Sequence, residues 1–325
     1  MDPLHKIAVS SMSIGEFEEL TPLLGGRASV VVGSVATPAD VARTTADADG
    51  VIVALQPMTA AHIAAFGDRV RVIGRAGVGL DTVDLDAAAE RGVAVIHEPG
   101  FATAEVADHA AALLLTIARQ VVAADRAVRK GWVTSLELGR VVELATSTLG
   151  VVGTGRIGSA LIERMRPFVS RIVVFDPFAS EVPAGVEVAA DLHALLGVSD
   201  LVSLHVPLSP ENRHLIGAGE LAAMKPDAML VNVSRGGLVD EAALAAALTS
   251  GQLAAAGIDV FSSEPLPDAS PLRQAPNIVL TPHIAGYSEG AFERLARWVI
   301  EDLLAHFGGD TPVHGRYAVP PRSNG

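Results

Sequence analysis

The sequence reads LGVVGTGRIG at residues 149–158 and continues as SALIERM at residues 159–165. The first four residues have the apolar pattern of a buried strand, and Ser159–Met165 has that of a helix. In such a unit Gly153 permits the tight turn, Gly155 lets the backbone approach a pyrophosphate, and Gly158 lets the helix pack close to the strand. The N-terminus of the helix then offers free N–H groups to phosphate oxygens. The stretch predicts a dinucleotide-binding turn.

An acidic residue at the end of the next predicted strand bears on the choice of cofactor. Asp176 follows Arg171–Phe175 and comes 18 residues after Gly158, near the ~20-residue spacing expected of a carboxylate that binds the adenosine ribose. Residues 177–180, PFAS, contain no arginine that would bind a 2′-phosphate. We therefore expect NAD rather than NADP. The alternative interpretation is a glycine-rich turn that binds no ligand.

Short apolar runs along the chain predict the fold class. They are rich in valine and isoleucine and do not alternate with polar residues, which is typical of strands covered on both faces. The runs are Ile7–Val9, Val30–Val32, Val51–Leu55, Val70–Ile73, Val93–Ile96, Leu149–Val152, Ile172–Phe175, Leu201–Val206, Met229–Val233, Ala256–Val260 and Ile278–Leu280. Helix-like segments between them are Pro38–Thr45, Ala60–Phe66, Leu85–Arg91, Ala104–Val122, Ser159–Met165, Asp240–Ser250 and Glu289–Phe307. This alternation predicts an α/β protein with parallel sheets and crossover helices. We expect two doubly wound, Rossmann-like domains with an interdomain active-site cleft.

The alternation of strands and helices is interrupted between about Ala104 and Ser147, which indicates a change of domain near Pro99–Ala104. We expect a substrate domain of residues 1–101 plus 287–325 and an NAD-binding Rossmann domain of residues 102–286. The apolar segment Ala104–Val122 contains charged residues, so it predicts a buried helix rather than a membrane span. The tail from Gly308 contains glycine and proline, and we expect it to be loosely ordered.

Composition and charge exclude several classes of function. The 325 residues carry a net charge of −13, from 37 acidic and 24 basic residues, which argues against a nucleic-acid or anionic membrane partner. The chain has no cysteine, which excludes disulfides, thiolate nucleophiles and cysteine-based metal sites. It lacks HExxH, GxSxG and P-loop motifs, and we expect no metal. Met1–Ser10 reads as a strand without a signal-peptide pattern, and we expect a cytoplasmic protein.

Arg235, Glu264 and His283 each follow a different predicted strand in the half that carries the glycine turn. Ligands bind at the carboxyl ends of parallel strands in such folds. A 2-keto acid reductase needs a cation for the carboxylate, an acid for the carbonyl oxygen and a group that keeps this acid protonated near neutral pH. Arg235, His283 and Glu264 could fill these roles in that order. Singly, each also has an ordinary interpretation, as a surface arginine, a structural histidine and a solvated loop glutamate.

The chain resembles the D-isomer-specific 2-hydroxyacid dehydrogenases over nearly its full length. The matching segments follow the order of that family: RAGVGLD at 75–81, ADH at 107–109, the glycine turn, HVPL at 205–208, VSRGG at 233–237 and TPH at 281–283. The resemblance implies that NADH gives a hydride to the carbonyl carbon of a 2-keto acid while a protonated histidine supplies the proton. The product would be a D-2-hydroxy acid.

The resemblance also implies roles for individual residues. Arg235 would bind the substrate carboxylate, and His283 would donate or accept the proton while Glu264 orients it. The backbone amides of Val78 and Gly79 would also bind the carboxylate. The implied cofactor contacts are Gly153, Gly155, Arg156, Ile157, Gly158, Asp176, His205, Val206, Pro207, Val233, Ser234, Asp259, His283 and Gly286.

The chain departs from parts of the family in ways that bear on substrate and partners. Members that act on 3-phosphoglycerate tend to carry basic residues after the strand Val51–Leu55, whereas residues 55–59 here are LQPMT. We therefore expect a small unphosphorylated 2-keto acid, such as glyoxylate, hydroxypyruvate or pyruvate.

Residues 105–109 and 286–289 resemble the C-terminal-binding-protein branch, so an NAD(H)-sensing interaction protein with little turnover is the alternative. That branch usually has tryptophan where Gly286 stands. The family resemblance further implies a homodimer, with contacts at Trp132 and Ala104–Val122, although the apolar face of that helix could equally be core.

Overall fold

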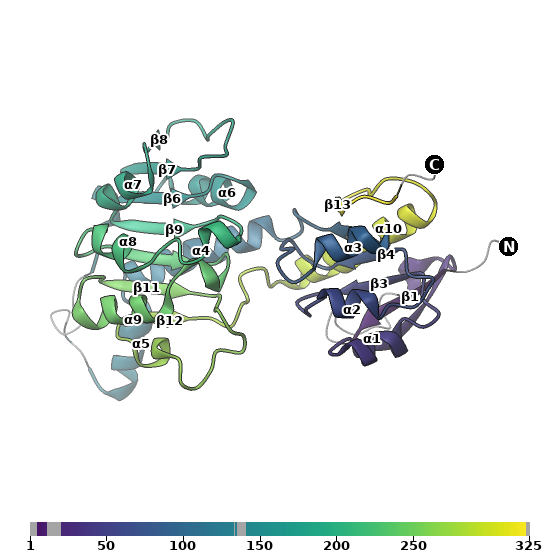
Figure 1. Ribbon diagram of the computed structural model, residues 1–325. Helices are drawn as coiled ribbons and strands as arrows, with labels where there is room; N and C mark the ends of the chain where they lie inside the picture. The colour runs from purple at the N-terminus through teal and green to yellow at the C-terminus, as the bar shows by residue number, and fades with distance from the viewer. Residues whose placement is uncertain (1–4, 12–20, 133, 135–140, 323–325) are drawn as a thin grey trace. The chain divides into compact units, whose positions relative to one another are not determined.

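The computed structural model describes residues 5–11, 21–132, 134 and 141–322, and the chain divides into two compact units (Figure 1). Unit 1 comprises Met1–Ala102 and Ser288–Gly325, and unit 2 comprises Thr103–Tyr287. These boundaries differ by one residue from those expected from the sequence. Each unit is an open sheet with helices on both faces.

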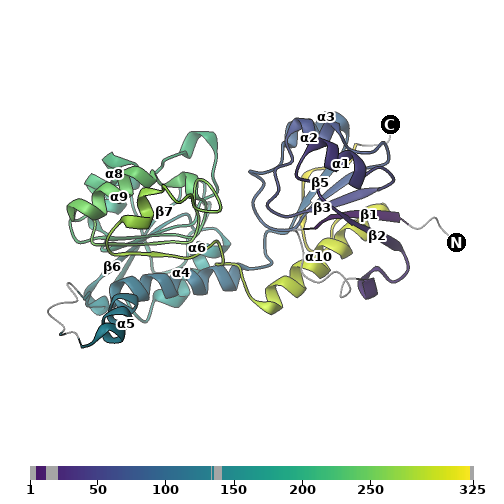
Figure 2. The same ribbon diagram turned by 90° about the horizontal axis from the view of Figure 1, so that it is seen from below.

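The sheet of unit 1 has six strands in the order β13-β5-β4-β3-β1-β2, all parallel except β13. The strands are β1 (His5–Ser10), β2 (Ala28–Gly33), β3 (Gly50–Val53), β4 (Val72–Arg75), β5 (Ala94–His97) and β13 (Arg316–Val319). The helices are α1 (Pro38–Thr44), α2 (Ala60–Ala64), α3 (Leu85–Arg91), α10 (Glu289–Phe307) and the 3₁₀ turn Thr21–Leu24. One face packs against α1 to α3 and the other against α10, which gives two apolar clusters (Figure 2).

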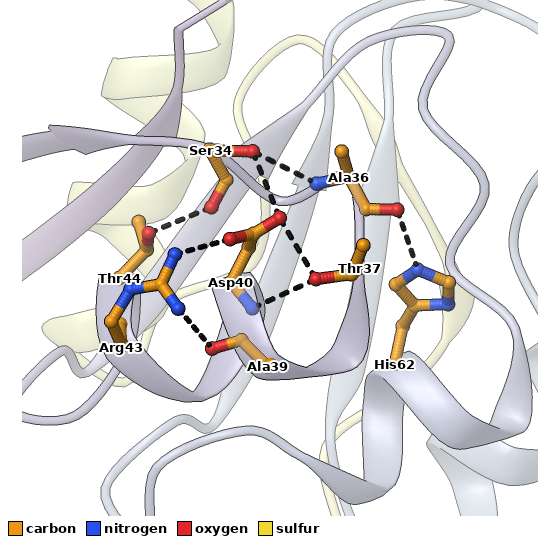
Figure 3. Close-up of polar contacts among 8 residues, drawn as sticks. All are labelled: Ser34, Ala36, Thr37, Ala39, Asp40, Arg43, Thr44 and His62. Carbon is orange, nitrogen blue, oxygen red and sulfur yellow. Dashed lines mark hydrogen bonds and ion pairs between the residues drawn. The ribbon is translucent and has the colours of Figure 1, made fainter.

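Helix α1 of unit 1 begins at a well-defined N-cap (Figure 3). The Thr37 hydroxyl accepts the backbone N–H of Asp40 at 3.2 Å and donates to the Asp40 carboxylate at 2.8 Å, as an N-cap threonine does. The hydrogen bond from the Thr37 hydroxyl to the Asp40 carboxylate and the ion pair with Arg43 hold the pKa of Asp40 below its usual value, although burial acts in the opposite direction. His62 of α2 contacts the carbonyl oxygen of Ala36 at 3.4 Å and so joins α2 to the same turn.

The sheet of unit 2 has seven parallel strands in the order β12-β11-β10-β9-β6-β7-β8. The strands are β6 (Thr148–Val152), β7 (Arg171–Phe175), β8 (Glu187–Val188), β9 (Leu201–Leu204), β10 (Met229–Asn232), β11 (Ala255–Ile258) and β12 (Ile278–Leu280). The helices are α4 (Thr103–Ala118), α5 (Val121–Lys130), α6 (Arg156–Met165), α7 (Leu192–Val198), α8 (Ala218–Ala223) and α9 (Glu241–Ser250), with 3₁₀ turns at Leu144–Thr146, Pro210–Asn212, Gly236–Leu238 and Pro271–Gln274. Helices α4 and α6 cover one face and α7 to α9 the other (Figure 2).

The predicted strands lie within two residues of those observed, but the single helix expected at Ala104–Val122 is wrong. Helix α4 ends at Ala118, and α5 starts after Gln120, whose φ of 56° is left-handed and cannot continue a helix. The apolar face of α4 lies in the core of unit 2, whereas α5 has no buried residue. No single helix of the described residues is long and apolar enough to cross a membrane, and α4 and α5 pass that test only as a pair bent by 55°.

The C-terminal strand β13 is anchored by a buried aspartate. Asp302 of α10 is fully buried, and its carboxylate accepts the backbone N–H groups of residues 313–315 at 2.6–3.0 Å. The chain then enters β13, which pairs antiparallel with β5. The expectation of a loosely ordered tail from Gly308 is therefore wrong for residues 316–319, because the pairing partner lies more than 200 residues away and leaves no local signature. Residues 1–4 and 323–325 of the predicted termini lie outside the described residues.

Candidate active site

The glycine turn between β6 and α6 has the geometry that a dinucleotide requires. Gly153 has a φ of 92°, a left-handed conformation that favours glycine. A Cβ atom on Gly158 would lie 2.0 Å from the Gly153 carbonyl oxygen, so only glycine lets α6 approach β6 this closely. At Gly155 a Cβ would meet nothing within 4 Å. Gly155 is also the N-cap of α6, and no side chain there accepts the first backbone N–H groups of the helix. The exposed N-terminus at Arg156 and Ile157 therefore fits an anionic ligand.

Asp176, at the end of β7, lies beside this turn. Its Oδ2 accepts the backbone N–H of Thr154 at 2.8 Å and the Thr154 hydroxyl at 3.2 Å, and its Oδ1 accepts the N–H of Phe178 at 3.0 Å. The carboxylate is thus fixed against the turn that would hold the pyrophosphate. A carboxylate in this place can accept hydrogen bonds from ribose hydroxyls and repels a 2′-phosphate.

His205 follows β9 and faces the glycine turn. A Cβ on Gly153 would lie 2.7 Å from the His205 carbonyl oxygen. The His205 Nε2 contacts the Ser203 hydroxyl at 2.8 Å, whereas its buried Nδ1 has no hydrogen-bond partner within the described part of the chain. Burial lowers the pKa of His205 to about 3, so the ring is neutral at physiological pH. The partly buried Val206 and the exposed Pro207 continue the loop.

The next loop, after β10, carries Val233, Ser234 and Arg235. The fully buried Asn232 shapes it: its Nδ2 donates to the Arg235 carbonyl oxygen at 2.8 Å, and its Oδ1 accepts the Ser234 N–H at 3.0 Å. The Ser234 hydroxyl donates to the carbonyl oxygen of Leu204 at 2.7 Å, which ties the loop to β9. Asn232 was not among the residues predicted from the sequence, although a polar residue inside an apolar strand was a signal.

His283 and Glu264 form a close pair at the end of the sheet. The Nδ1 of His283 lies 2.6 Å from Oε2 of Glu264, and both side chains are partly exposed. Burial raises the pKa of Glu264, but hydrogen bonds from His283 and the Phe261 N–H, with the charges of His283 and Arg235, lower it by more. The pKa of Glu264 therefore lies below its usual value, and the carboxylate is ionised beside the imidazole.

Hydrogen bonds to Asp259 hold the backbone of the loop that carries His283. His283 has a φ of 55°, in the left-handed region. Its N–H donates to the Asp259 carbonyl oxygen at 2.7 Å. The fully buried Asp259 carboxylate accepts the Thr281 hydroxyl at 2.6 Å and the N–H groups of Ile284 and Ala285 at 3.0 and 2.9 Å. The observed partners of Asp259 are therefore loop atoms, and its contact with the nicotinamide stays a prediction.

All the predicted cofactor residues and the three catalytic candidates belong to unit 2. They follow β6, β7, β9, β10, β11 and β12, whose parallel pairing brings their carboxyl ends to one edge of the sheet. Gly286 ends this set, just after the His283 loop. The predicted substrate contacts Val78 and Gly79 lie in unit 1, where the Val78 carbonyl oxygen contacts Nδ1 of His97 at 2.9 Å. The described residues include no group of three or more His, Cys, Asp or Glu side chains that could hold a metal ion.

Comparison with known proteins connects this geometry to one family. Residues 111–285 match the model described as D-isomer specific 2-hydroxyacid dehydrogenase, NAD binding domain. The chain is 41% identical over 274 residues to a glyoxylate reductase of Korarchaeum cryptofilum, covering 82% of each protein. It is 37% identical over 276 residues to a D-3-phosphoglycerate dehydrogenase of Archaeoglobus fulgidus, covering 84% of this chain but only 52% of that relative. The chain spans about half the length of the D-3-phosphoglycerate dehydrogenases that it matches.

A solved structure supports the same assignment for the whole chain. The NADPH-dependent glyoxylate/hydroxypyruvate reductase of Sinorhizobium meliloti, in complex with NADP and malonate, superposes with a TM-score of 0.86 at 29% identity. The match covers 99% of this chain and 100% of that one. The chain therefore belongs to the D-isomer-specific 2-hydroxyacid dehydrogenase family, and it is a nicotinamide-dependent oxidoreductase that interconverts 2-keto and 2-hydroxy acids.

Proposed function

We propose that the chain is an NAD-dependent reductase of a small unphosphorylated 2-keto acid, with His283 as the proton donor. The observation that carries this proposal is the 2.6 Å contact between Nδ1 of His283 and the ionised Glu264. A carboxylate only accepts hydrogen bonds, so Nδ1 carries a proton. Nε2 is then the atom that exchanges a proton with the substrate oxygen. This is the arrangement that general acid–base catalysis by histidine requires.

The chain supplies the proton, the carboxylate site and the charge stabilisation. When bound, NADH supplies the hydride that reduces the carbonyl carbon. Protonated His283 gives its Nε2 proton to the carbonyl oxygen, and Glu264 stabilises the protonated imidazole until that transfer. Arg235 binds the substrate carboxylate and stabilises the negative charge that develops on the oxygen. Val78 and Gly79 of unit 1 are the further predicted contacts of the substrate carboxylate.

The preference for NAD over NADP rests on Asp176. Its carboxylate is fixed at the ribose end of the glycine turn by the Thr154 and Phe178 contacts. A 2′-phosphate would bring a second negative charge beside it, and residues 177–180 offer no arginine to neutralise this charge. The reductase of Sinorhizobium meliloti that resembles this chain is NADPH-dependent, so Asp176 is the residue to test for cofactor preference.

The preference for an unphosphorylated substrate rests on the loop after β3. Its residues 55–59 include no lysine or arginine, Met58 is fully buried, and Leu55 is half exposed. A substrate phosphate would therefore find no cation in this loop. Glyoxylate reductases of Korarchaeum cryptofilum and Thermococcus litoralis, each 41% identical to the chain, are consistent with a short 2-keto acid. D-3-phosphoglycerate dehydrogenases match at the same identity, so the preference rests on the loop.

We also propose a cytoplasmic homodimer that associates through α5 and Trp132. Val121 and Val128 of α5 are each more than half exposed, and Trp132 is 87% exposed. Exposed apolar side chains on α5 and just after it favour a protein interface. Light scattering at micromolar concentration should give a dimer mass that Val128→Arg lowers, while Val188→Arg, at a similarly exposed site on β8, should not. A monomeric wild-type protein would contradict the dimer.

The decisive experiment for the function is NADH oxidation with a panel of substrates. The panel contains glyoxylate, hydroxypyruvate, pyruvate and 3-phosphohydroxypyruvate, each measured with NADH and NADPH. We expect turnover with one of the first three and NADH. Preference for the phosphorylated acid would overturn the substrate proposal. NADH binding without turnover on any 2-keto acid would favour the alternative of an NAD(H)-sensing interaction protein.

A further inference from the structure

A second histidine, His109, contacts the loop that carries His283. His109 belongs to α4, and its Nε2 lies 3.0 Å from the Thr281 hydroxyl and 3.6 Å from Oδ1 of Asp259. His109 is 172 residues from Thr281 in the sequence, and its side chain is mostly buried. The proposed proton transfer by His283 makes no use of it, so its place in the site needs an explanation.

Hydrogen-bond donors and acceptors in this cluster determine which atom of His109 carries a proton. The Thr281 hydroxyl lies 2.6 Å from the Asp259 carboxylate, and it has only one hydrogen to donate. Since the carboxylate only accepts, that hydrogen points to Asp259. The hydroxyl oxygen must then accept from His109, which therefore has its proton on Nε2. The chain of donors runs from His109 through Thr281 to Asp259.

Asp259, the last acceptor in this series of hydrogen bonds, fixes the backbone on both sides of His283. Thr281 and Ile284 both bond Oδ1 of Asp259, Ala285 bonds Oδ2, and His283 itself bonds the Asp259 carbonyl oxygen. The left-handed φ of His283 is an uncommon conformation for a residue with a side chain, so the loop needs such contacts to hold it. Without the His109 donor the Thr281 hydroxyl oxygen loses a hydrogen bond, and the bond from Thr281 to Asp259 on one side of the loop weakens, because linked hydrogen bonds strengthen one another.

We propose that His109 is a positioning residue for His283: by donating to Thr281 it keeps the loop on Asp259 and keeps the His283 imidazole in contact with Glu264. The inference rests on the proposed role of His283 as the proton donor. Displacement of a catalytic group by about 1 Å can cost about 100-fold in rate. Loss of the His109 donor should therefore lower kcat, whereas NADH binding at the glycine turn should not change.

Matched variants separate this role from general destabilisation. His109→Leu removes the donor, and His109→Gln replaces Nε2–H by an amide N–H at a similar distance from the backbone. Thr281→Val removes the hydroxyl with little change of shape, and Thr281→Ser retains it. His193→Leu is the control, because His193 is an exposed histidine of α7 in the same unit. The variants are assayed for kcat, KM, NADH affinity and the pH above which reduction slows.

We expect His109→Leu and Thr281→Val to lower kcat by about 10- to 100-fold. They should also lower the pH above which reduction slows, which is the alkaline pH limb, because the contact between His283 and Glu264 weakens. His109→Gln and Thr281→Ser should recover most of both losses, and His193→Leu should behave as wild type. Unchanged kcat and pH limb in His109→Leu would overturn the proposal. So would equal losses in the Leu and Gln variants, which would indicate a packing role.

Imidazole nitrogen NMR tests the inference without turnover. His109 of the wild-type chain should show a proton on Nε2, and the His283 ring signals should move in Thr281→Val but not in Thr281→Ser. A proton on Nδ1 alone of His109 would contradict the donor chain. If the wild-type protein bound NADH but reduced no 2-keto acid, the proposed function would fail, and these NMR results would still decide whether His109 positions the loop.

Discussion

Replacing Glu98 by glutamine should make unit 1 more stable at alkaline pH. Glu98 follows β5 and is only 1% exposed, and neither of its carboxyl oxygens has a donor among the described residues. Its neighbour is Asp302, whose carboxylate already accepts three backbone N–H groups. Burial, with the charge of Asp302, raises the pKa of Glu98 from 4.5 to about 8. Glu98 therefore holds its proton at neutral pH.

The sign and size of the effect follow from proton linkage. The folded protein holds the Glu98 proton up to about pH 8, whereas the unfolded chain loses it near pH 4.5. The contribution of Glu98 to the free energy of unfolding is therefore fully present below pH 4.5 and is lost as the pH rises to about 8. At ~1.36 kcal/mol per pH unit, the loss between pH 6 and pH 8 is at most ~2.7 kcal/mol. Glutamine cannot ionise, so Glu98→Gln lacks this loss.

Urea unfolding at pH 6 and pH 8 measures the effect. In a Trp132→Phe background, Trp298 of α10 is the remaining tryptophan and reports on unit 1. The stability of Glu98→Gln relative to its parent should rise by about 1–3 kcal/mol between the two pH values. Glu90→Gln, which changes an exposed carboxyl of α3, should show no such rise. If the free energy of unfolding changed equally between pH 6 and pH 8 in the parent and in Glu98→Gln, the reasoning would be refuted.

The remaining predictions concern the cofactor and the catalytic residues. Asp176→Ala should narrow the gap between NADH and NADPH affinity, measured by fluorescence titration, and equal affinities in the wild type would contradict the assignment. His283→Ala should bind NADH normally but lose turnover by orders of magnitude in steady-state assays, and wild-type turnover would disprove the mechanism. Arg235→Ala should raise KM and lower kcat together, because its charge acts on bound substrate and transition state alike. Glu264→Gln should lower the pH above which reduction slows, with a milder rate loss; an unmoved pH profile would exclude its role beside His283.

The position of the candidate site residues at strand ends, though not their roles, was predictable from the sequence. Asp176 and the segment around Arg235 each follow an apolar strand with a polar residue, and the glycine turn follows one with a glycine motif. Parallel pairing brings such positions to one edge. Local pattern was sufficient there because the sheet supplies the long-range arrangement.

Contacts between distant segments were not predictable in this way. The hydrogen bond of His109 to Thr281, and the association of Glu98 with Asp302, join residues far apart in sequence, and no single residue in these pairs has an unusual local pattern. The break after α4 was missed for a different reason. Gln120 adopts a left-handed backbone that glycine usually provides, so its sequence gave no sign of a helix end.

The insertion of unit 2 between the two parts of unit 1 has a consequence for biosynthesis. Strands β1 to β5 are complete once His97 has been made, but α10, which packs on one face of their sheet, is complete only about 210 residues later. At translation rates of about 5–20 residues per second, this interval lasts roughly 10–40 s. Unit 2 is contiguous in sequence, so all of its strands and helices are synthesised within that interval. The nascent chain thus lacks the cover of an apolar sheet face that includes Ile7, Ile52, Val72 and Ile96 for the whole interval.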